Sequence, residues 1–447
     1  MDALLVLTNI GIILLLGLLV SVLSKRLKIS NVLLLVLLGL VLGRILYSGH
    51  PLFFFEPNLL VGIGILALVM VVFDGASRFR FREVNELSIA SLKVIGYFTL
   101  FSVLLITSFT NLLFFEGVNV TNILFSIIFA VVVVGTDPGS VFAMLKDFVG
   151  ERAKKVVGLL QIEAIINTPL IVLIPFIILD IIKNLELGQG DFLSSFIGQI
   201  PALFAQIIVG IGAGVVVGLV VFKTMQKVYS HEFSPIAIIT AAILAYILAE
   251  NLHGNGVLAV ATLGLVFGNI YVKEKPQLQE FNYMLSNALE ILVFVLVGLM
   301  IRVPLTLDFF LKSFFLFCLL VLSRSAATFV ALKKLDYSFK EKLFISFNMP
   351  KGIAVAVVAF SFALYTDVQM GIILNLILAF VVYSLILSSV VDRMSKKFIK
   401  VDVKTDKIDE TVPHPKLKNP APPPRSTPPK VPPKNPPKSG GKIFKLP

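Results

Sequence analysis

Three ionisable residues lie inside apolar stretches that are long enough to cross a lipid bilayer. They are Asp137 in VVVVGTDPGS, Glu163 in LLQIEAIINTPL and Lys351 in FNMPKGIAVAVV. A charge near the centre of a membrane span costs roughly 2.5–3.5 kcal/mol on insertion scales. Sequences keep such a cost where the charge binds or moves an ion, so these residues predict ion transport.

The segment around Asp137 combines a carboxylate with residues that interrupt a helix. Gly135 and Pro138 disfavour a continuous helix, and Pro138 leaves a carbonyl of the preceding turn without its donor. Freed carbonyls, the Thr136 hydroxyl and the Asp137 carboxylate are oxygen ligands suited to a small hard cation. Alternatively, Asp137 only caps the second half-helix, with Pro138 at its first position. The two roles are compatible.

A second interrupted segment lies in the other half of the chain, where Pro350 and Gly352 flank Lys351. Two segments interrupted in this way indicate inverted repeats with a binding site near the bilayer centre. The two helices are predicted to run in opposite directions, so their broken centres are expected to cross. Lys351 would then act as a fixed cation that compensates helix-dipole ends. The alternative is a lysine that extends to the membrane surface.

The span that contains Glu163 presents a polar face. Glu163 and Asn167 are four residues apart, so they share one side of a helix, which we expect to look at the break near Asp137. A buried glutamate needs a cationic partner, which either Arg324 or Lys351 supplies. A purely structural ion pair is the alternative interpretation.

The composition defines a membrane protein. The chain is 57% hydrophobic and 15% charged, and its mean hydropathy is +0.94. Cys318 is the sole cysteine, which excludes an intrachain disulfide, and no cofactor or metal motif is present. The four histidines are scattered at membrane edges or in the tail, so an enzyme finds little support. No cleavable signal peptide is expected, because residues 1–23 lack a basic start.

Apolar runs between charged breaks predict an all-α protein of about 13 transmembrane helices. The expected ranges are 3–23, 31–48, 57–75, 88–113, 121–145, 155–182, 200–222, 234–250, 255–272, 284–301, 307–332, 341–364 and 370–393.

The connecting loops alternate along the chain between many and few Lys and Arg residues. One side of the membrane carries 18 Lys and Arg and the other side 4, which predicts an outside N-terminus and a cytoplasmic C-terminus. Half of the +12 net charge lies in residues 401–447, so the charge indicates topology and not nucleic-acid binding. Asp74, near the cytoplasmic end of the third span, lines an entry funnel or lies at the interface.

Residues 401–447 differ in composition from the rest of the chain. They hold 13 of the 23 prolines together with many lysines, and they cannot bury an apolar core. We expect a disordered cytoplasmic tail. A proline-rich ligand for an unknown partner domain and a basic tether to anionic lipid are the sharper alternatives.

Seven motifs in order resemble the monovalent cation/proton antiporter superfamily, with the NhaP-like sodium/proton antiporters as the nearest branch. They are FDGASRF, GTDPGSV, IEAIINTP, AENLHGNGVLAVATLGLVFGN, FVLVGLMI, LSRSAAT and NMPKGIAVAVV, and the resemblance covers about residues 1–395. It implies a homodimer in the cell membrane that works by alternating access. It also implies interface-domain helices in 1–87 and 234–301, transport-domain helices in 88–183 and 302–396, a linker helix in 184–233 and the tail in 397–447.

The resemblance also implies an ion site, and the chain departs from the family pattern at two positions. In the family, the aspartate of the TDP motif and a Glu-x-x-x-Asn-Asp segment surround the ion, and these positions are Asp137, Glu163 and Asn167. Where the segment usually ends in aspartate, this chain has Thr168, which can coordinate a cation but cannot titrate. Where the family has an arginine before glycine, this chain has Lys351, as electrogenic members of the family do.

The function expected from the sequence is exchange of Na+, or else K+ or Li+, for protons. Asp137 would carry the proton or the cation, Thr136 and Thr168 would add neutral oxygens, and Asn167 would orient the site. Glu163 would pair with Arg324 or Lys351. The alternative is a descendant that no longer exchanges ions and serves as a cation-conducting pathway or an ion sensor, because Thr168 replaces the aspartate.

Overall fold

A computed structural model describes residues 3–27, 30–47, 50–78, 81–137, 151–188, 192–227, 230, 232–304 and 306–399. All of them belong to one compact unit, Met1–Val403. The predicted tail and the second half of the interrupted 121–145 segment lie outside the described residues.

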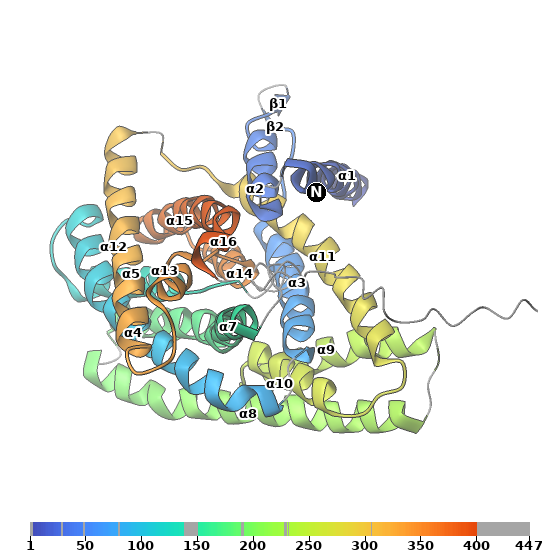
Figure 1. Cartoon of the computed structure of the whole chain (residues 1–447). Helices are drawn as coiled ribbons and strands as arrows, with labels where there is room; N and C mark the ends of the chain where they lie inside the picture. Colours follow the sequence, from blue (N-terminus) through green and yellow to red (C-terminus); the bar gives the residue numbers. More distant parts are fainter. Residues whose placement is uncertain are drawn as a thin grey trace, which may run out of the picture. The chain divides into compact units, whose positions relative to one another are not determined.

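The architecture is all-α (Figure 1). Two strands of two residues each, β1 (Leu46–Tyr47) and β2 (His50–Pro51), form a short antiparallel pair after the second helix. The helices are α1 (Ala3–Leu27), α2 (Asn31–Leu42), α3 (Pro57–Ser77), α4 (Phe81–Phe114), α5 (Val120–Val132), α7 (Glu151–Glu186), α8 (Phe192–Lys227), α9 (Phe233–Asn251), α10 (Gly256–Asn269), α11 (Lys275–Met300), α12 (Leu307–Ala331), α13 (Phe339–Phe347), α14 (Ile353–Phe362), α15 (Val368–Arg393) and α16 (Ser395–Phe398).

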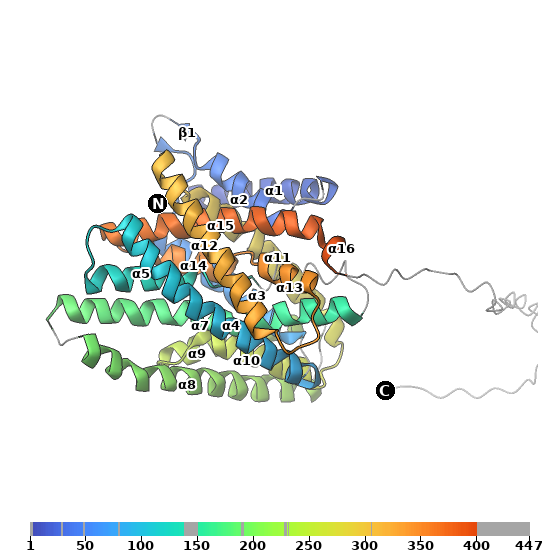
Figure 2. The ribbon, with the colours of Figure 1, turned by 60° about the vertical axis from the view of Figure 1, so that its left-hand side comes forward.

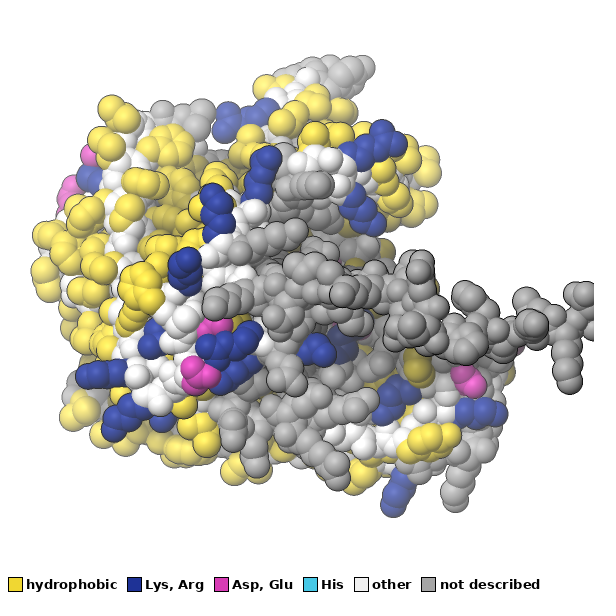
Figure 3. All heavy atoms as spheres, in the orientation of Figure 1, with side chains coloured by type: hydrophobic (Ala, Val, Ile, Leu, Met, Phe, Trp, Pro, Cys, Tyr) yellow, Lys and Arg dark blue, Asp and Glu magenta, His cyan; other side chains and the backbone are white. Residues whose placement is uncertain are grey.

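Hydropathy and length make most of these helices candidate membrane spans. Within the described ranges, 9 helices are long and apolar enough to cross a bilayer, and α2, α5, α10 and α14 are shorter apolar helices. Only 17% of the most apolar window of α1 and 22% of that of α8 are buried, so both helices expose apolar side chains outward. Figure 3 shows hydrophobic side chains gathered over α12, α4 and α5 as well. Such an apolar exterior is suited to lipid.

Three of the expected helices are interrupted or end several residues early, and the ends of other helices are shifted. The range 31–48 was too long, because α2 ends at Leu42 and the chain turns at Gly43 into β1. The range 121–145 is interrupted after Val132, and 341–364 is divided into α13 and α14. The interruptions fall at the glycine and proline positions that disfavour a helix. The total of 13 spans and the inverted repeats stay predictions.

The helices form two neighbourhoods. In one, α4 packs against α5, α7 and α12; in the other, α3 packs against α10 and α11, and α8 against α9 and α10. In Figure 2, α7, α8 and α15 run nearly parallel. The neighbourhoods touch through α14 with α3 and through α15 with α2. Since all described residues cluster as one unit, the division into interface and transport domains stays a prediction.

Helices α2 and α11 make an unusually close contact. A Cβ atom on Gly39 would collide with the carbonyl oxygen of Val295, and one on Gly298 would collide with the carbonyl oxygen of Val36. Glycine at both positions therefore allows the two backbones to touch, as small residues do between membrane helices.

Candidate ion-binding site

The first helix break follows α5. Val133 caps the helix, and Val134 and Gly135 donate only to carbonyls three residues back, those of Val131 and Val132. Residues 135–137 are not helical. The Gly-Thr-Asp sequence therefore leaves the helical path inside an apolar span, as the sequence predicted.

The second break, between α13 and α14, lies against the first. The amide of Asp137 donates to the carbonyl oxygen of Pro350 over 2.9 Å. Gly352 packs so closely on Asp137 that a Cβ atom there would collide with the aspartate side chain. Its φ of −120° is open to any residue, so space and not backbone conformation requires the glycine.

Lys351 joins the two breaks. Its ammonium donates to the carbonyl oxygens of Val133 and of Gly135, the latter over 3.0 Å. These carbonyls lie at the carboxyl end of α5, where the helix dipole is negative and cations are favoured. Lys351 is 1% exposed, so its side chain turns into the break and does not extend to the membrane surface.

Glu163 of α7 pairs with Arg324 of α12 and not with Lys351. Nη1 and Nη2 of Arg324 both donate to the carboxylate, with Nη2 2.8 Å from Oε2, and both residues are 0% exposed. The guanidinium also lies over the ring of Phe98, 4.8 Å from its centroid, and donates to the carbonyl oxygen of Ile345 over 3.5 Å. Both carboxylate oxygens of Glu163 are therefore engaged by one cation.

Three neutral polar side chains lie near or on these elements. Asn167 Nδ2 donates to the carbonyl oxygen of Val134 over 3.0 Å, which ties α7 to the first break. Thr168 donates its hydroxyl to Ala164 of its own helix over 2.7 Å. The hydroxyl of Thr136 is buried and has no hydrogen-bond partner among the described residues. The hydrogen bond of Thr168 therefore stays within α7.

Asp74 is held by its own helix end. Arg78 donates to its two carboxylate oxygens over 2.9 and 3.1 Å, and Asp74 is 6% exposed. The carboxylate is thus part of an ion pair. Its predicted location, in an entry funnel or at the membrane interface, stays a prediction.

The sequence analysis missed two carboxylates. Glu290 of α11 interacts electrostatically with both Asp137 and Asp74. Asp392 of α15 accepts a hydrogen bond from Asn348 over 2.7 Å, just before the second break. Each is the one acidic residue of a predicted span, 284–301 or 370–393, which is the signal that identified Asp137.

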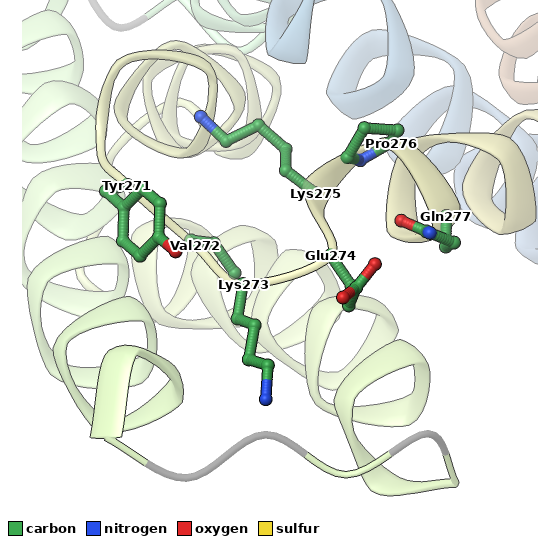
Figure 4. A pocket seen from close by; sticks show the side chains of 7 residues that line it. All are labelled: Tyr271, Val272, Lys273, Glu274, Lys275, Pro276 and Gln277. Carbon is green, nitrogen blue, oxygen red and sulfur yellow. The ribbon is translucent and has the colours of Figure 1, made fainter.

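One surface pocket lies away from the two breaks. It has a volume of about 540 Å³ and is lined by Tyr271–Gln277, which form the loop after α10 and the first turn of α11 (Figure 4). The ammonium of Lys275 is taken up by the carbonyls of Gly268 and Ile270 at the end of α10. The described residues also contain no group of three His, Cys, Asp or Glu side chains that could hold a metal. The chemistry therefore gathers at the crossing.

A fold of apolar helices in which two interrupted segments meet beside buried charges is typical of secondary transporters. The pattern of the family described as sodium/hydrogen exchanger, transmembrane, matches residues 11–394. The chain belongs to this family of transmembrane proteins, and it is a multi-pass membrane protein.

Individual relatives are similar to parts of the chain. The K(+)/H(+) antiporter NhaP of Alkalimonas amylolytica is 25% identical over 357 residues, which are 78% of this chain and 59% of that protein. The Na(+)/H(+) antiporter 1 of Methanocaldococcus jannaschii is 25% identical over 380 residues, 80% of this chain and 83% of the relative. The chain thus spans about three fifths of the first relative's length.

A solved structure shares the fold. The structure of the sodium proton antiporter MjNhaP1 from Methanocaldococcus jannaschii at pH 8 matches with a TM-score of 0.73 and 20% identity, over 89% of this chain and 99% of that one.

Proposed function

We propose that the protein exchanges a monovalent cation for protons, with Asp137 as the group that carries either one. The observation that supports this most directly is a carboxylate, 1% exposed, at the meeting point of two helix breaks. A buried carboxylate next to interrupted backbone is suited to a cation in its charged form and to a proton in its neutral form.

The surroundings of Asp137 support this exchange. The buried hydroxyl of Thr136, the next residue in the chain, offers a neutral oxygen for a cation. Asn167 holds the backbone of the first break in place through Val134. Lys351 supplies one fixed positive charge, so the site with a charged Asp137 and no bound cation is close to neutral.

Glu163 has a supporting role in this mechanism. Its charge is balanced by Arg324, and both of its oxygens are engaged, so it is a poor ligand for a transported ion. The pair instead links α7 to α12.

The cation and the setting are further parts of the proposal. We propose Na+ as the cation, with K+ and Li+ as the alternatives, since the similar proteins include both a Na(+)/H(+) and a K(+)/H(+) antiporter. The protein would act as a homodimer in the cell membrane, with its N-terminus outside and its C-terminus in the cytoplasm.

Proteoliposomes with a lumenal pH dye test the exchange. Outward gradients of Na+, K+ or Li+ are imposed in turn, with choline as the inert cation and protein-free liposomes as the control. Exchange predicts lumenal acidification with at least one of the three cations and none with choline. Identical traces with and without protein, for all three cations, contradict the proposal.

A non-exchanging descendant is the second candidate, and Thr168 is the observation that favours it. The hydroxyl there cannot titrate and donates within its own helix. This candidate predicts either radioactive cation uptake without any coupled proton movement, as for a conducting pathway, or cation binding without flux, as for a sensor.

A further inference from the structure

A narrow crevice lies between four helices, away from the ion site. Its volume is about 110 Å³, and α2 and α11 line one side through Leu40 and Ile301, while α12 and α15 line the other through Phe310 and Ala379. The walls are apolar apart from Arg44 and the Tyr383 hydroxyl.

Arg44 is the single cation of the crevice. It follows Gly43, the residue that caps α2, and its side chain is exposed. Among the described residues, Arg44 has no ion-pair partner and its side chain makes no hydrogen bond. A guanidinium without a protein partner is available to a phosphate, to which it can donate two parallel hydrogen bonds.

The crevice has a charged end and an apolar floor. Arg44 and Ile301 lie just past the ends of α2 and α11, and Phe310 lies in the first turn of α12. The floor lies deeper, because Tyr383 is bonded to Ser313 over 3.0 Å, and Ser313 is roughly 9 Å along α12 from its first residue. That bond also uses the Tyr383 hydroxyl, so the floor presents mainly carbon.

We propose that this crevice binds one anionic phospholipid, with its phosphate on Arg44 and one acyl chain against Phe310, Ala379 and Tyr383. A charged end at a helix terminus and an apolar floor within the span match the headgroup and chain of a lipid. A zwitterionic lipid satisfies Arg44 less well, because its own ammonium competes for the phosphate. A soluble anion would leave the apolar floor unused.

An occupant of the crevice touches helices from both predicted domains. If α12 and α15 move against α2 and α11 during transport, the lipid binds one arrangement more tightly than the other and shifts the balance between them. This consequence rests on the proposed alternating access, whereas lipid binding itself does not.

Native mass spectrometry of the purified full-length protein tests the binding. The probes are phosphatidylglycerol and phosphatidylcholine of equal chain length, with glycerol phosphate as a soluble competitor. We expect phosphatidylglycerol to be retained in preference to phosphatidylcholine. Arg44→Gln should weaken its retention about tenfold or more, as loss of a charge-assisted hydrogen bond does.

Two further variants make the test specific. Lys312→Gln removes a cation that pairs with Asp308 and does not line the crevice, so it should retain phosphatidylglycerol like the parent. Val382→Phe fills the crevice and should weaken both lipids. The proposal fails if Arg44→Gln binds like the parent, if Lys312→Gln loses as much, or if Val382→Phe has no effect. It also fails if glycerol phosphate displaces the lipid, which would mark a free-anion site. These measurements do not depend on transport. If the protein proves not to exchange ions, the result on lipid binding is unaffected.

Discussion

At the scale of single residues, Asp137 combines deep burial with contacts to the second break. Its backbone donates to Pro350, and its side chain packs on Gly352. Asp137→Asn keeps this shape and removes the charge, so we expect cation-dependent proton movement to be abolished while the protein remains folded. The proteoliposome assay measures the first and size-exclusion chromatography the second.

The matched control is Asp308→Asn, which removes an exposed carboxylate paired with Lys312. It should exchange at the parental rate. Full activity of Asp137→Asn would transfer the carrier role to another carboxylate, with Glu290 as the nearest candidate by its electrostatic interaction with Asp137.

Thr168 tests the other half of the site model. A cation is held largely by ligand charge, so the parent should have weak apparent cation affinity, and Thr168→Asp should lower the half-saturating cation concentration. Repulsion between two carboxylates also favours proton uptake, so the active window should move to higher pH. Transport measured over a grid of pH and cation concentration checks both effects.

Thr168→Asn serves as the uncharged control, and it should leave both the pH window and the affinity near those of the parent. If Thr168→Asp restores exchange to an inert parent, the non-exchanging candidate is correct. If it changes nothing, residue 168 does not face the ion, in keeping with its hydrogen bond to Ala164.

At the scale of elements, the Glu163–Arg324 pair fastens α7 to α12. Glu163→Ala leaves the Arg324 guanidinium buried without its counter-charge, and removal of one partner of a buried pair costs roughly 3–5 kcal/mol. We therefore expect a clear fall in the thermal unfolding temperature of the detergent-solubilised protein. A variant that is as stable as the parent but transports nothing would instead make Glu163 a direct ion ligand.

The contact between the two breaks requires a residue without a side chain at position 352, which is Gly352. Gly352→Ala places a methyl group against Asp137, and overpacking of this kind costs roughly 1–3 kcal/mol. We expect lower thermal stability and reduced exchange. Gly371→Ala in α15 is the control, since no atom lies within 4 Å of the Cβ it would add, and it should be neutral in both assays.

The sequence predicted the elements well where hydropathy and proline coincide. Asp137 and Lys351 were expected to meet because each sits in an interrupted span, and the structure brings both breaks together. Hydropathy marks only the part of a helix inside the bilayer, however, so α4 and α11 begin at Phe81 and Lys275, before the predicted 88 and 284.

Side-chain partners were harder to predict. Arg324 and Lys351 were equal candidates for Glu163, because the choice depends on which helices become neighbours and not on spacing along the chain. Glu290 was overlooked although it lies in a predicted span. Its electrostatic interaction with Asp137 arises from the packing of α11, which no local sequence pattern encodes.

At the scale of the whole molecule, the proposed site contains one titrating carboxylate at the crossing. One proton would then replace one monovalent cation, so exchange should be electroneutral. Proteoliposomes clamped at different membrane potentials with valinomycin and K+ should show the same equilibrium Na+ and proton gradients. A dependence on potential would require a second titrating group, for which Lys351 and Glu290 are the candidates.

The glycine contact between α2 and α11 bears on which part of such a molecule moves. Gly39 and Gly298 bring two backbones together so closely that the carbonyl of each helix faces the α-carbon of the other. Sliding one helix along the other would force these carbonyls over neighbouring side chains. The two helices are therefore suited to be a rigid part of the protein that stays in place. Any movement of the ion site during transport would then take place along the outer surface of this helix pair.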